Sequence, residues 1–172
     1  MAEVKRRIIA VDDDRAILNV FQRALESRGY SVDTAETGQE ALEKIRTGFY
    51  NLALLDIKLP DMDGTDLLDS IQESSPKMIK VMVTGYPDLE NAIKSLNMGA
   101  DAYVVKPISM EELLAVVKKH LNKQAQVDLS TATETFGELL QIRAKQLDEK
   151  KKLKNAQGHE AVVSDQDAKP RD

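Results

Sequence analysis

The stretch from Asn51 to Gly64, NLALLDIKLPDMDG, most constrains the fold of this chain. Its run from Leu52 to Leu55 is apolar without alternation, which is typical of a central strand in a parallel sheet covered on both faces. The run ends at Asp56 and continues into a loop rich in Pro, Asp and Gly. Ligands bind outside the carboxyl ends of such strands, so we predict that Asp56 is the reactive group.

Four other short apolar or β-branched runs alternate with segments of helical periodicity. We expect strands at 7–11, 31–35, 52–55, 78–83 and 101–105, and helices at 15–28, 38–48, 65–74, 87–99 and 109–123. Asp14 caps the first helix, whose inward face is expected to carry Ile17, Val20, Phe21, Ala24 and Leu25. Regular alternation of strands and helices predicts an α/β fold, a doubly wound parallel sheet with helices on both faces.

The 172 residues are enough for one core and an appendage. We expect a compact domain over 1–123, a helical extension over 124–154 after a polar stretch at 124–130, and a disordered tail over 155–172. In the extension, one heptad register puts Arg143 at a core position and the other puts Gln146 and Glu149 there. A weak coiled coil and a helix that docks on a partner both remain open.

Composition excludes several classes of function. The formal charge of -5 argues against direct nucleic-acid binding. With no Cys and two His, the chain has no ligand cluster for zinc or redox chemistry. The N-terminus has neither the pattern of a signal peptide nor the length of a membrane span, so we expect a cytoplasmic protein without membrane insertion.

Polar residues follow four of the predicted strands. Asp12 and Asp13 follow the first strand, Asp56 the third, Thr84 the fourth and Lys106 the fifth. Parallel strands bring these ends to one edge of the sheet. Clustered carboxylates repel one another, and an all-oxygen site of this kind suits Mg²⁺. The ammonium and the hydroxyl suit the oxygens of a phosphoryl group.

Simpler explanations exist for single residues. The run Asp12 to Asp14, taken alone, is equally typical of a polar turn with a helix cap. Asp61 and Asp63 are predicted to be turn residues and not ligands. The run Lys150 to Lys154 lies beside acidic residues, which favours a solvated helix face over a basic binding patch.

Residues 6–123 resemble the receiver domain of two-component response regulators. The motifs AVDDD, LLDIKLPDMDG, VTGYP and DAYVVKP carry this resemblance, because they occur in the order and spacing of that family. The resemblance implies a flavodoxin-like sheet of order 2-1-3-4-5. It also implies that Asp56 takes a phosphoryl group from a sensor histidine kinase or a histidine phosphotransfer protein.

The resemblance further assigns roles to individual residues. Mg²⁺ would be held by Asp12, Asp13, Asp56 and the backbone carbonyl of Lys58. Lys106 and Thr84 would bind the phosphoryl group, Thr84 and Tyr103 would form a switch, and Pro107 would follow a cis bond. The signal would be carried by the fourth helix, the fifth strand and the fifth helix, while Lys58 and Tyr86 would tune hydrolysis of the phosphoryl group. By itself, Tyr103 is equally typical of a half-buried strand aromatic.

The leading functional hypothesis is a receiver that is not a dedicated enzyme and that signals through protein contacts, with a downstream target or in a homodimer. The 49 residues after Lys123 are too few for a winged-helix or ATPase output domain. A second hypothesis is a phosphatase of the haloacid dehalogenase type, with Asp12 as its nucleophile. A third is a pseudo-receiver that binds partners without being phosphorylated.

Overall fold

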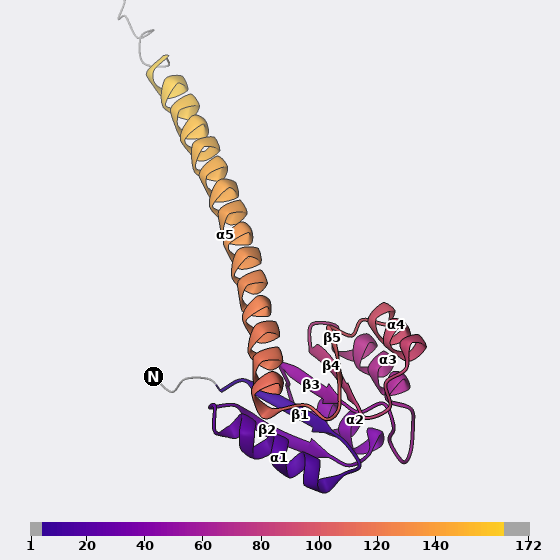
Figure 1. Cartoon of the computed structure of the whole chain (residues 1–172). Coiled ribbons are helices and arrows are strands. Elements are labelled where there is room, and N and C mark those ends of the chain that lie inside the picture. Colours follow the sequence, from indigo (N-terminus) through magenta and orange to yellow (C-terminus); the bar gives the residue numbers. More distant parts are fainter. Residues whose placement is uncertain (1–4, 164–172) are drawn as a thin grey trace, which may run out of the picture. The chain divides into compact units, whose positions relative to one another are not determined.

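The computed structural model describes residues 5–163, with side chains as far as Asn155. Five strands form one parallel sheet in the order β2-β1-β3-β4-β5 (Figure 1). They are β1 (Arg7–Val11), β2 (Ser31–Ala35), β3 (Leu52–Leu55), β4 (Ile79–Thr84) and β5 (Ala102–Val105). The predicted doubly wound sheet of order 2-1-3-4-5 is therefore confirmed.

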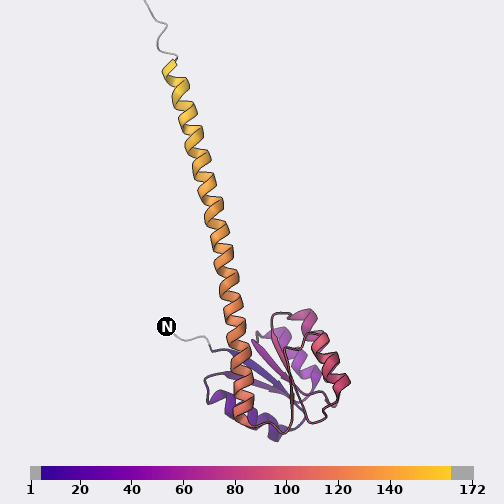
Figure 2. The ribbon, with the colours of Figure 1, turned by 45° about the horizontal axis from the view of Figure 1, so that its top comes forward.

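Five helices alternate with the strands and cover both faces of the sheet (Figure 2). They are α1 (Arg15–Glu26), α2 (Gly38–Thr47), α3 (Gly64–Ser74), α4 (Leu89–Asn97) and α5 (Met110–Val163). One face packs against α1 and the first turns of α5, and the other packs against α2 and α3. The alternation of strands and helices predicted from hydrophobic periodicity therefore produces the expected layers.

Strand β3 lies at the centre of the core. None of its four residues is more than 1% exposed, as expected for a continuous apolar run in a parallel sheet. Leu54 packs with Phe21 and Val117 on one face, while Leu55 packs with Leu68 on the other. Asp56 follows directly, so the strand that is most firmly held by the core carries the predicted reactive group.

Local capping signals set several helix ends. The side chain of Asp14 accepts from the N–H of Ala16 at 2.8 Å and begins α1. Ser109 and Glu112 each accept from the other's backbone N–H, at 3.2 and 3.1 Å, which completes the predicted capping box before α5. Helix α4 begins at Leu89 and not at Pro87, because Asp88 takes the extended conformation of an N-cap residue.

The C-terminal helix differs from the expectation. Helix α5 runs without interruption through the polar stretch 124–130 and continues past Lys154 to Val163, within the region expected to be disordered. No proline lies between Pro107 and Pro170, so every residue between them can donate its helical hydrogen bond. Residues 164–172, where the predicted tail ends, lie outside the described residues.

The chain divides into two units, the first ending at Gln124 and the second beginning at Ala125. The first unit contains the whole sheet, and the second consists of the later part of α5. Over residues 5–163, no helix has both the length and the apolar character needed to cross a bilayer.

Candidate functional site

The polar residues predicted at the strand ends do meet at one edge of the sheet. Strands β1 and β3 are neighbours, and the N–H of Asp56 donates to the carbonyl oxygen of Val11 at 3.0 Å. At the other end of the cluster, the N–H of Lys106 donates to the carbonyl oxygen of Thr84 at 2.8 Å. Backbone hydrogen bonds between parallel strands therefore bring together residues that are up to 94 positions apart in the chain.

Lys106 is the cation at the centre of this cluster. Its Nζ donates to Asp12 Oδ2 and, at 3.1 Å, to Asp56 Oδ2. Burial lowers the pKa of Lys106, but the hydrogen bond and charge of Asp12 and the charge of Asp56 outweigh burial, so the net pKa is raised. The side chain thus stays an ammonium group between two carboxylates, in reach of any oxyanion bound at Asp56.

The acidic residues form a second part of the site. Asp12, Asp13 and Asp56 each offer a carboxylate oxygen, and these oxygens lie within 4.8 Å of one another. Asp12 and Asp56 are only 3% and 6% exposed, and burial raises the pKa of Asp12 despite its bond with Lys106. One ammonium does not balance three carboxylates, so the cluster favours a further cation.

The available oxygens fit a hard divalent ion. Among the described residues, Asp56 Oδ1 is a buried carboxylate oxygen that has no hydrogen-bond partner. A set of carboxylate oxygens with one exposed member, Asp13, matches the preference of Mg²⁺ for few protein ligands and several waters. Lys58 lies two residues beyond Asp56, in a loop where it forms an isolated antiparallel bridge with Asp63.

The loop between β3 and α3 is held at several points. The N–H of Gly64 donates to the carbonyl oxygen of Ile57 at 2.6 Å, and a Cβ at Gly64 would overlap the carbonyl of Asp56. Asp61 accepts from the N–H groups of Gly38 and Gln39 at 2.9 and 2.8 Å. It thereby caps α2 together with the N-cap residue Thr37, which accepts from the N–H of Glu40 at 3.1 Å. The close packing at Gly64 and the bonds of Asp61 fix the course of the loop that follows Asp56.

Asp61 and Asp63 bind backbone N–H groups, as turn and cap residues do. Asp63 accepts from the N–H of Thr65 at 3.2 Å at the start of α3. Their assignment as turn residues and not ligands agrees with these contacts. The cap that Asp61 provides for α2 was missed, because the two are more than 20 residues apart and no local motif links them.

Thr84 and Tyr103 lie in the adjacent strands β4 and β5, where Thr84 pairs with Val105 and Tyr103 pairs with Met82. Thr84 is fully buried, and its Oγ1 accepts from the N–H of Tyr86 at 3.1 Å. Tyr103 is half-buried and packs against the α2 and α3 side of the core. Its hydroxyl is buried and has no hydrogen-bond partner among the described residues. The peptide bond between Lys106 and Pro107 is cis, as expected.

Two side chains from neighbouring loops meet at the same edge. Lys58 follows β3 and Tyr86 follows β4, and Lys58 Nζ lies 4.9 Å from the centroid of the Tyr86 ring. This distance is within the range of a cation–π interaction. The sequence indicated that both residues flank Asp56, but it contained no signal for their direct contact.

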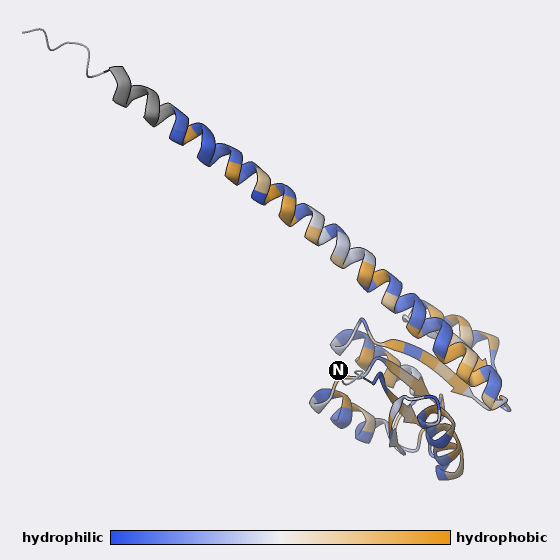
Figure 3. Cartoon of the chain, turned by 90° about the vertical axis from the view of Figure 1, so that its left-hand side faces the viewer, coloured by the Kyte–Doolittle hydropathy of each residue, from blue (hydrophilic) through white to orange (hydrophobic). Residues whose placement is uncertain are grey.

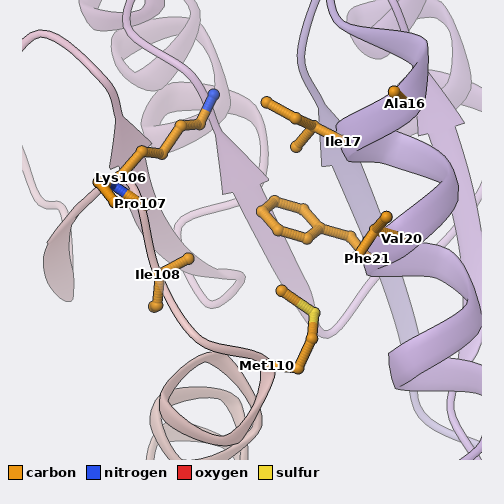
Figure 4. A pocket seen from close by; sticks show the side chains of 8 residues that line it. All are labelled: Ala16, Ile17, Val20, Phe21, Lys106, Pro107, Ile108 and Met110. Atoms are coloured by element: carbon orange, nitrogen blue, oxygen red, sulfur yellow. The ribbon is translucent and has the colours of Figure 1, made fainter.

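An apolar groove lies beside Lys106, between α1 and the segment that connects β5 to α5. Figure 4 shows its lining residues, which are Ala16, Ile17, Val20, Phe21, Lys106, Pro107, Ile108 and Met110. Val20, expected on the inward face of α1, is 50% exposed here, while Leu18 is buried instead. Hydrophobic periodicity alone did not predict this groove, because the groove exists only where the distant segment after β5 leaves part of α1 uncovered.

Comparison with known proteins identifies related sequences and folds. Residues 8–118 match the response regulator receiver domain family. The chain is 38% identical over 138 residues to a probable transcriptional regulator, ycf27, of Cyanophora paradoxa, covering 80% of this chain and 57% of that protein. It is 37% identical over 112 residues to the transcriptional regulatory protein DltR of Streptococcus agalactiae serotype III, covering 65% of this chain and 50% of that protein.

A solved structure is also similar. A CheY-like response regulator receiver domain from Methanospirillum hungatei JF-1 has 51% sequence identity and a TM-score of 0.70, covering 71% of this chain and 98% of that one. By contrast, the chain spans about half the length of the two curated relatives.

Proposed function

Because this chain belongs to the response regulator receiver domain family, we propose that Asp56 accepts a phosphoryl group from a phosphohistidine of a partner protein. The single observation that best supports this proposal is the position of Asp56, beside the acidic residues after β1 and 3.1 Å from the ammonium of Lys106. That partner is a sensor histidine kinase or a histidine phosphotransfer protein.

In the proposed step, a carboxylate oxygen of Asp56 attacks phosphorus. A phosphorus–oxygen bond forms, the phosphorus–nitrogen bond breaks, and the imidazole nitrogen keeps the electron pair. Negative charge on the phosphoryl oxygens must be stabilised throughout, which is the main contribution that a protein makes to phosphoryl transfer. Lys106 supplies a cation that is already 3.1 Å from Asp56, and Thr84 supplies a hydroxyl donor.

The same proposal assigns a metal ion to the acidic cluster. Asp12, Asp13, Asp56 and the backbone carbonyl of Lys58 would hold Mg²⁺, with Asp12 acting largely through a bound water. When bound, the ion supplies positive charge to the phosphoryl oxygens. The buried Asp56 Oδ1, which has no partner among the described residues, supports this assignment.

The apolar groove suits the approach of the phosphoryl donor. Lys106 is both a member of the site and part of the wall of the groove (Figure 4). A helix of the donor that covered Ile17, Val20 and Met110 would therefore lie next to Asp56. A Val20→Glu variant is expected to lose transfer from the donor protein while keeping its labelling by acetyl phosphate, which needs no docking.

Output belongs to the same proposal. Phosphorylation adds about 1.5 to 2 negative charges beside Thr84, which can draw its hydroxyl toward the phosphate and change the packing of Tyr103. Apolar residues lie exposed on the adjacent α4 and β5, namely Leu89, Ile93, Leu96 and Val105. We propose that this surface contacts a downstream protein. We also propose that the receiver itself is cytoplasmic and has no dedicated enzymatic activity.

Acetyl phosphate with Mg²⁺ tests the proposal directly. One phosphoryl group per chain is expected, located on Asp56 by mass spectrometry of borohydride-reduced protein. Asp56→Asn should abolish the label, whereas Asp69→Asn, which changes an exposed carboxylate on α3, should leave it unchanged. Full labelling of the Asp56→Asn protein would overturn the proposal.

The same experiment separates the two alternatives. A phosphatase of the haloacid dehalogenase type would release phosphate continuously and carry its label on Asp12. Asp12 Oδ2 is instead engaged by Lys106, and its Oδ1 accepts from the N–H of Asp14 at 2.9 Å. A pseudo-receiver would remain folded but would take up no phosphoryl label.

A further inference from the structure

The second half of α5 carries an apolar stripe that no other described residue covers. Its members are Leu129, Phe136, Leu140 and Leu147, which we call the α5 stripe. They are 69%, 63%, 55% and 48% exposed. Figure 3 shows apolar residues spaced along a helix that is otherwise mainly hydrophilic. Removing large apolar side chains from water is favourable, so this stripe favours a partner that covers it.

The spacing of the α5 stripe places its members on one face of a straight helix. Successive members are seven, four and seven residues apart. Leu129 and Leu147 are therefore 18 residues apart, which is about five full turns at 3.6 residues per turn. This is the heptad register that also puts Arg143 at a core position, because steps of seven, four and seven residues connect core positions of a heptad repeat.

The same spacing is palindromic. It reads identically in either chain direction, and its midpoint falls at Glu138, halfway between Phe136 and Leu140. If two copies of the helix lie antiparallel with a two-fold axis near Glu138, Leu129 of one copy faces Leu147 of the other. Phe136 likewise faces Leu140, and the small residues Ala132 and Ala144 face each other.

Charge separates the helix into two halves. Residues 125–138 contain three acidic residues, Asp128, Glu134 and Glu138, and no basic residue. Residues 139–155 contain six basic residues, which are Arg143, Lys145, Lys150, Lys151, Lys152 and Lys154, and two acidic ones, Asp148 and Glu149. A parallel pair would set the basic half against its own copy, whereas an antiparallel pair sets it against the acidic half.

Individual charges agree with the antiparallel arrangement. Arg143 and Lys154 lie in line with the α5 stripe, so a parallel, in-register pair would bring each against its own copy. In the antiparallel pair, Arg143 instead faces Thr133. Asp128 and Lys150 lie on the same side of the α5 stripe. The two-fold axis of an antiparallel pair places this side of one helix next to the same side of the other. Asp128 of one copy therefore approaches Lys150 of the other.

We propose that the occupant of the α5 stripe is a second copy of this chain, with the two helices antiparallel and centred near Glu138. The palindromic apolar spacing supplies the shared surface, and the two oppositely charged halves supply its direction. The pairing does not require phosphorylation, so it can be tested independently of the proposed receiver chemistry.

Light scattering after size exclusion tests the pairing on the full chain. The wild-type protein is expected to have about twice the mass of one chain, and Phe136→Glu is expected to have the mass of one chain. The matched control is Val127→Glu, because Val127 is 55% exposed on the opposite side of the same helix and should leave the mass unchanged. A wild-type protein that stays monomeric at every concentration, or equal effects of both substitutions, would overturn the proposal.

Disulfide trapping tests the orientation. The chain has no cysteine, so Leu129→Cys and Leu147→Cys each introduce a single thiol. Under oxidised glutathione, the antiparallel pair predicts a cross-linked dimer only when the two variants are mixed. Cross-links within either variant alone would show a parallel pair and refute the orientation.

Salt dependence gives a second readout of orientation. Screening weakens attraction between the acidic and basic halves, so the dissociation constant of the antiparallel pair should rise with ionic strength. A parallel pair would instead tighten as salt screens repulsion between like charges.

Discussion

At the scale of single residues, charge balance dominates the site. Lys106 binds two buried carboxylates, Asp12 and Asp56, while the third, Asp13, is exposed beside them. Burial makes each ionised group costly unless it is paired. The arrangement is therefore held by one ammonium in the absence of metal, and it gains from any further cation that binds the free oxygens.

Asp13 gives a clean test of the proposed metal site. Mg²⁺ should raise the thermal unfolding midpoint of the wild-type protein, because a ligand that binds the folded state stabilises it. Asp13→Asn should lose most of that gain, although the metal-free variant should unfold at the same or a higher temperature, since one repelling carboxylate is gone. Differential scanning calorimetry with and without Mg²⁺ measures both effects. An unchanged gain in the variant would remove Asp13 from the metal site.

A second polar cluster lies away from the proposed site. Asp33 Oδ2 accepts from the hydroxyl of Tyr50 and from the guanidinium of Arg7, both at 2.7 Å. Burial raises the pKa of Asp33, but these two hydrogen bonds outweigh it and the net pKa is lowered. Burial first, and then Asp33, raise the pKa of Tyr50 to about 12.

The Asp33 cluster predicts a window of pH in which it stabilises the fold. Because the pKa of Asp33 is lowered in the folded state, Asp33 contributes to the stability of the fold. This contribution is fully present above pH 3.8, the ordinary pKa, and is lost as pH falls through the folded pKa. Because the pKa of Tyr50 is raised in the folded state, Tyr50 contributes stability that is fully present below pH 10.0 and is lost as pH rises towards about 12. Tyr50→Phe should therefore cost about 1 kcal/mol at neutral pH.

Urea unfolding across pH measures this cost. The difference between wild type and Tyr50→Phe should be constant at neutral pH and shrink at both extremes. A difference that does not depend on pH would mean that Tyr50 contributes through packing alone.

At the scale of elements, the loop after β3 connects the strand that precedes Asp56 to two helices. Asp61 caps α2 and Asp63 caps α3, while Gly64 packs against the carbonyl of Asp56. A helix N-terminus has unsatisfied N–H groups, so a carboxylate held there stabilises both the helix and the loop that supplies it. The path of the chain beyond Asp56 is thus fixed from two sides.

Asp61→Ala is expected to destabilise the fold by about 0.5 to 2 kcal/mol, the usual cost of losing a helix cap. Hydrogen exchange should rise at the first N–H groups of α2 and in the loop after Asp56. Asp66→Ala is the control, since Asp66 is an exposed acidic residue in the first turn of α3 that does not cap α2. Equal losses of stability in the two variants would mean that the Asp61 cap has no specific effect.

At the scale of the whole molecule, the core belongs to the first unit. Of the residues whose side chains the structure describes, every buried apolar one lies between Ile8 and Leu121. Two bonds tie the end of that unit to the sheet layer, from Arg6 to the carbonyl oxygen of Leu121 and from Gln124 to that of Lys77, both at 2.6 Å. Residues 125–155 contribute no buried side chain.

Truncation after Gln124 should therefore leave the receiver unit intact. The shortened protein is expected to unfold cooperatively with a midpoint close to that of the full chain, and to label on Asp56 with the same stoichiometry. If the α5 stripe pairs as proposed, the shortened protein should also be monomeric. Loss of cooperative unfolding would show that the second unit is needed to stabilise the first.

Much of the fold could be predicted from sequence, because its signals are local. The apolar run before Asp56, the cap at Asp14 and the capping box at Ser109 each specify an element within a few residues. The site residues could be gathered as a set, because parallel strands bring their carboxyl ends to one edge. Helix α5 extends further than the sequence predicts, because low apolar content does not prevent a helix from forming where no proline interrupts it.

The amino-acid sequence by itself determined the order of strands and helices, and it placed Asp56, the proposed reactive group, with the polar residues of the other strand ends at one edge of the sheet. Only the tertiary structure decided which apolar side chains stay exposed, such as Val20 and Ile93, and which distant groups meet, such as Asp61 with α2 and Lys58 with Tyr86. Periodicity shows that a residue is apolar and on which helical face it lies. Whether anything covers that face depends on packing between segments that are far apart in the chain, and no local pattern encodes that packing.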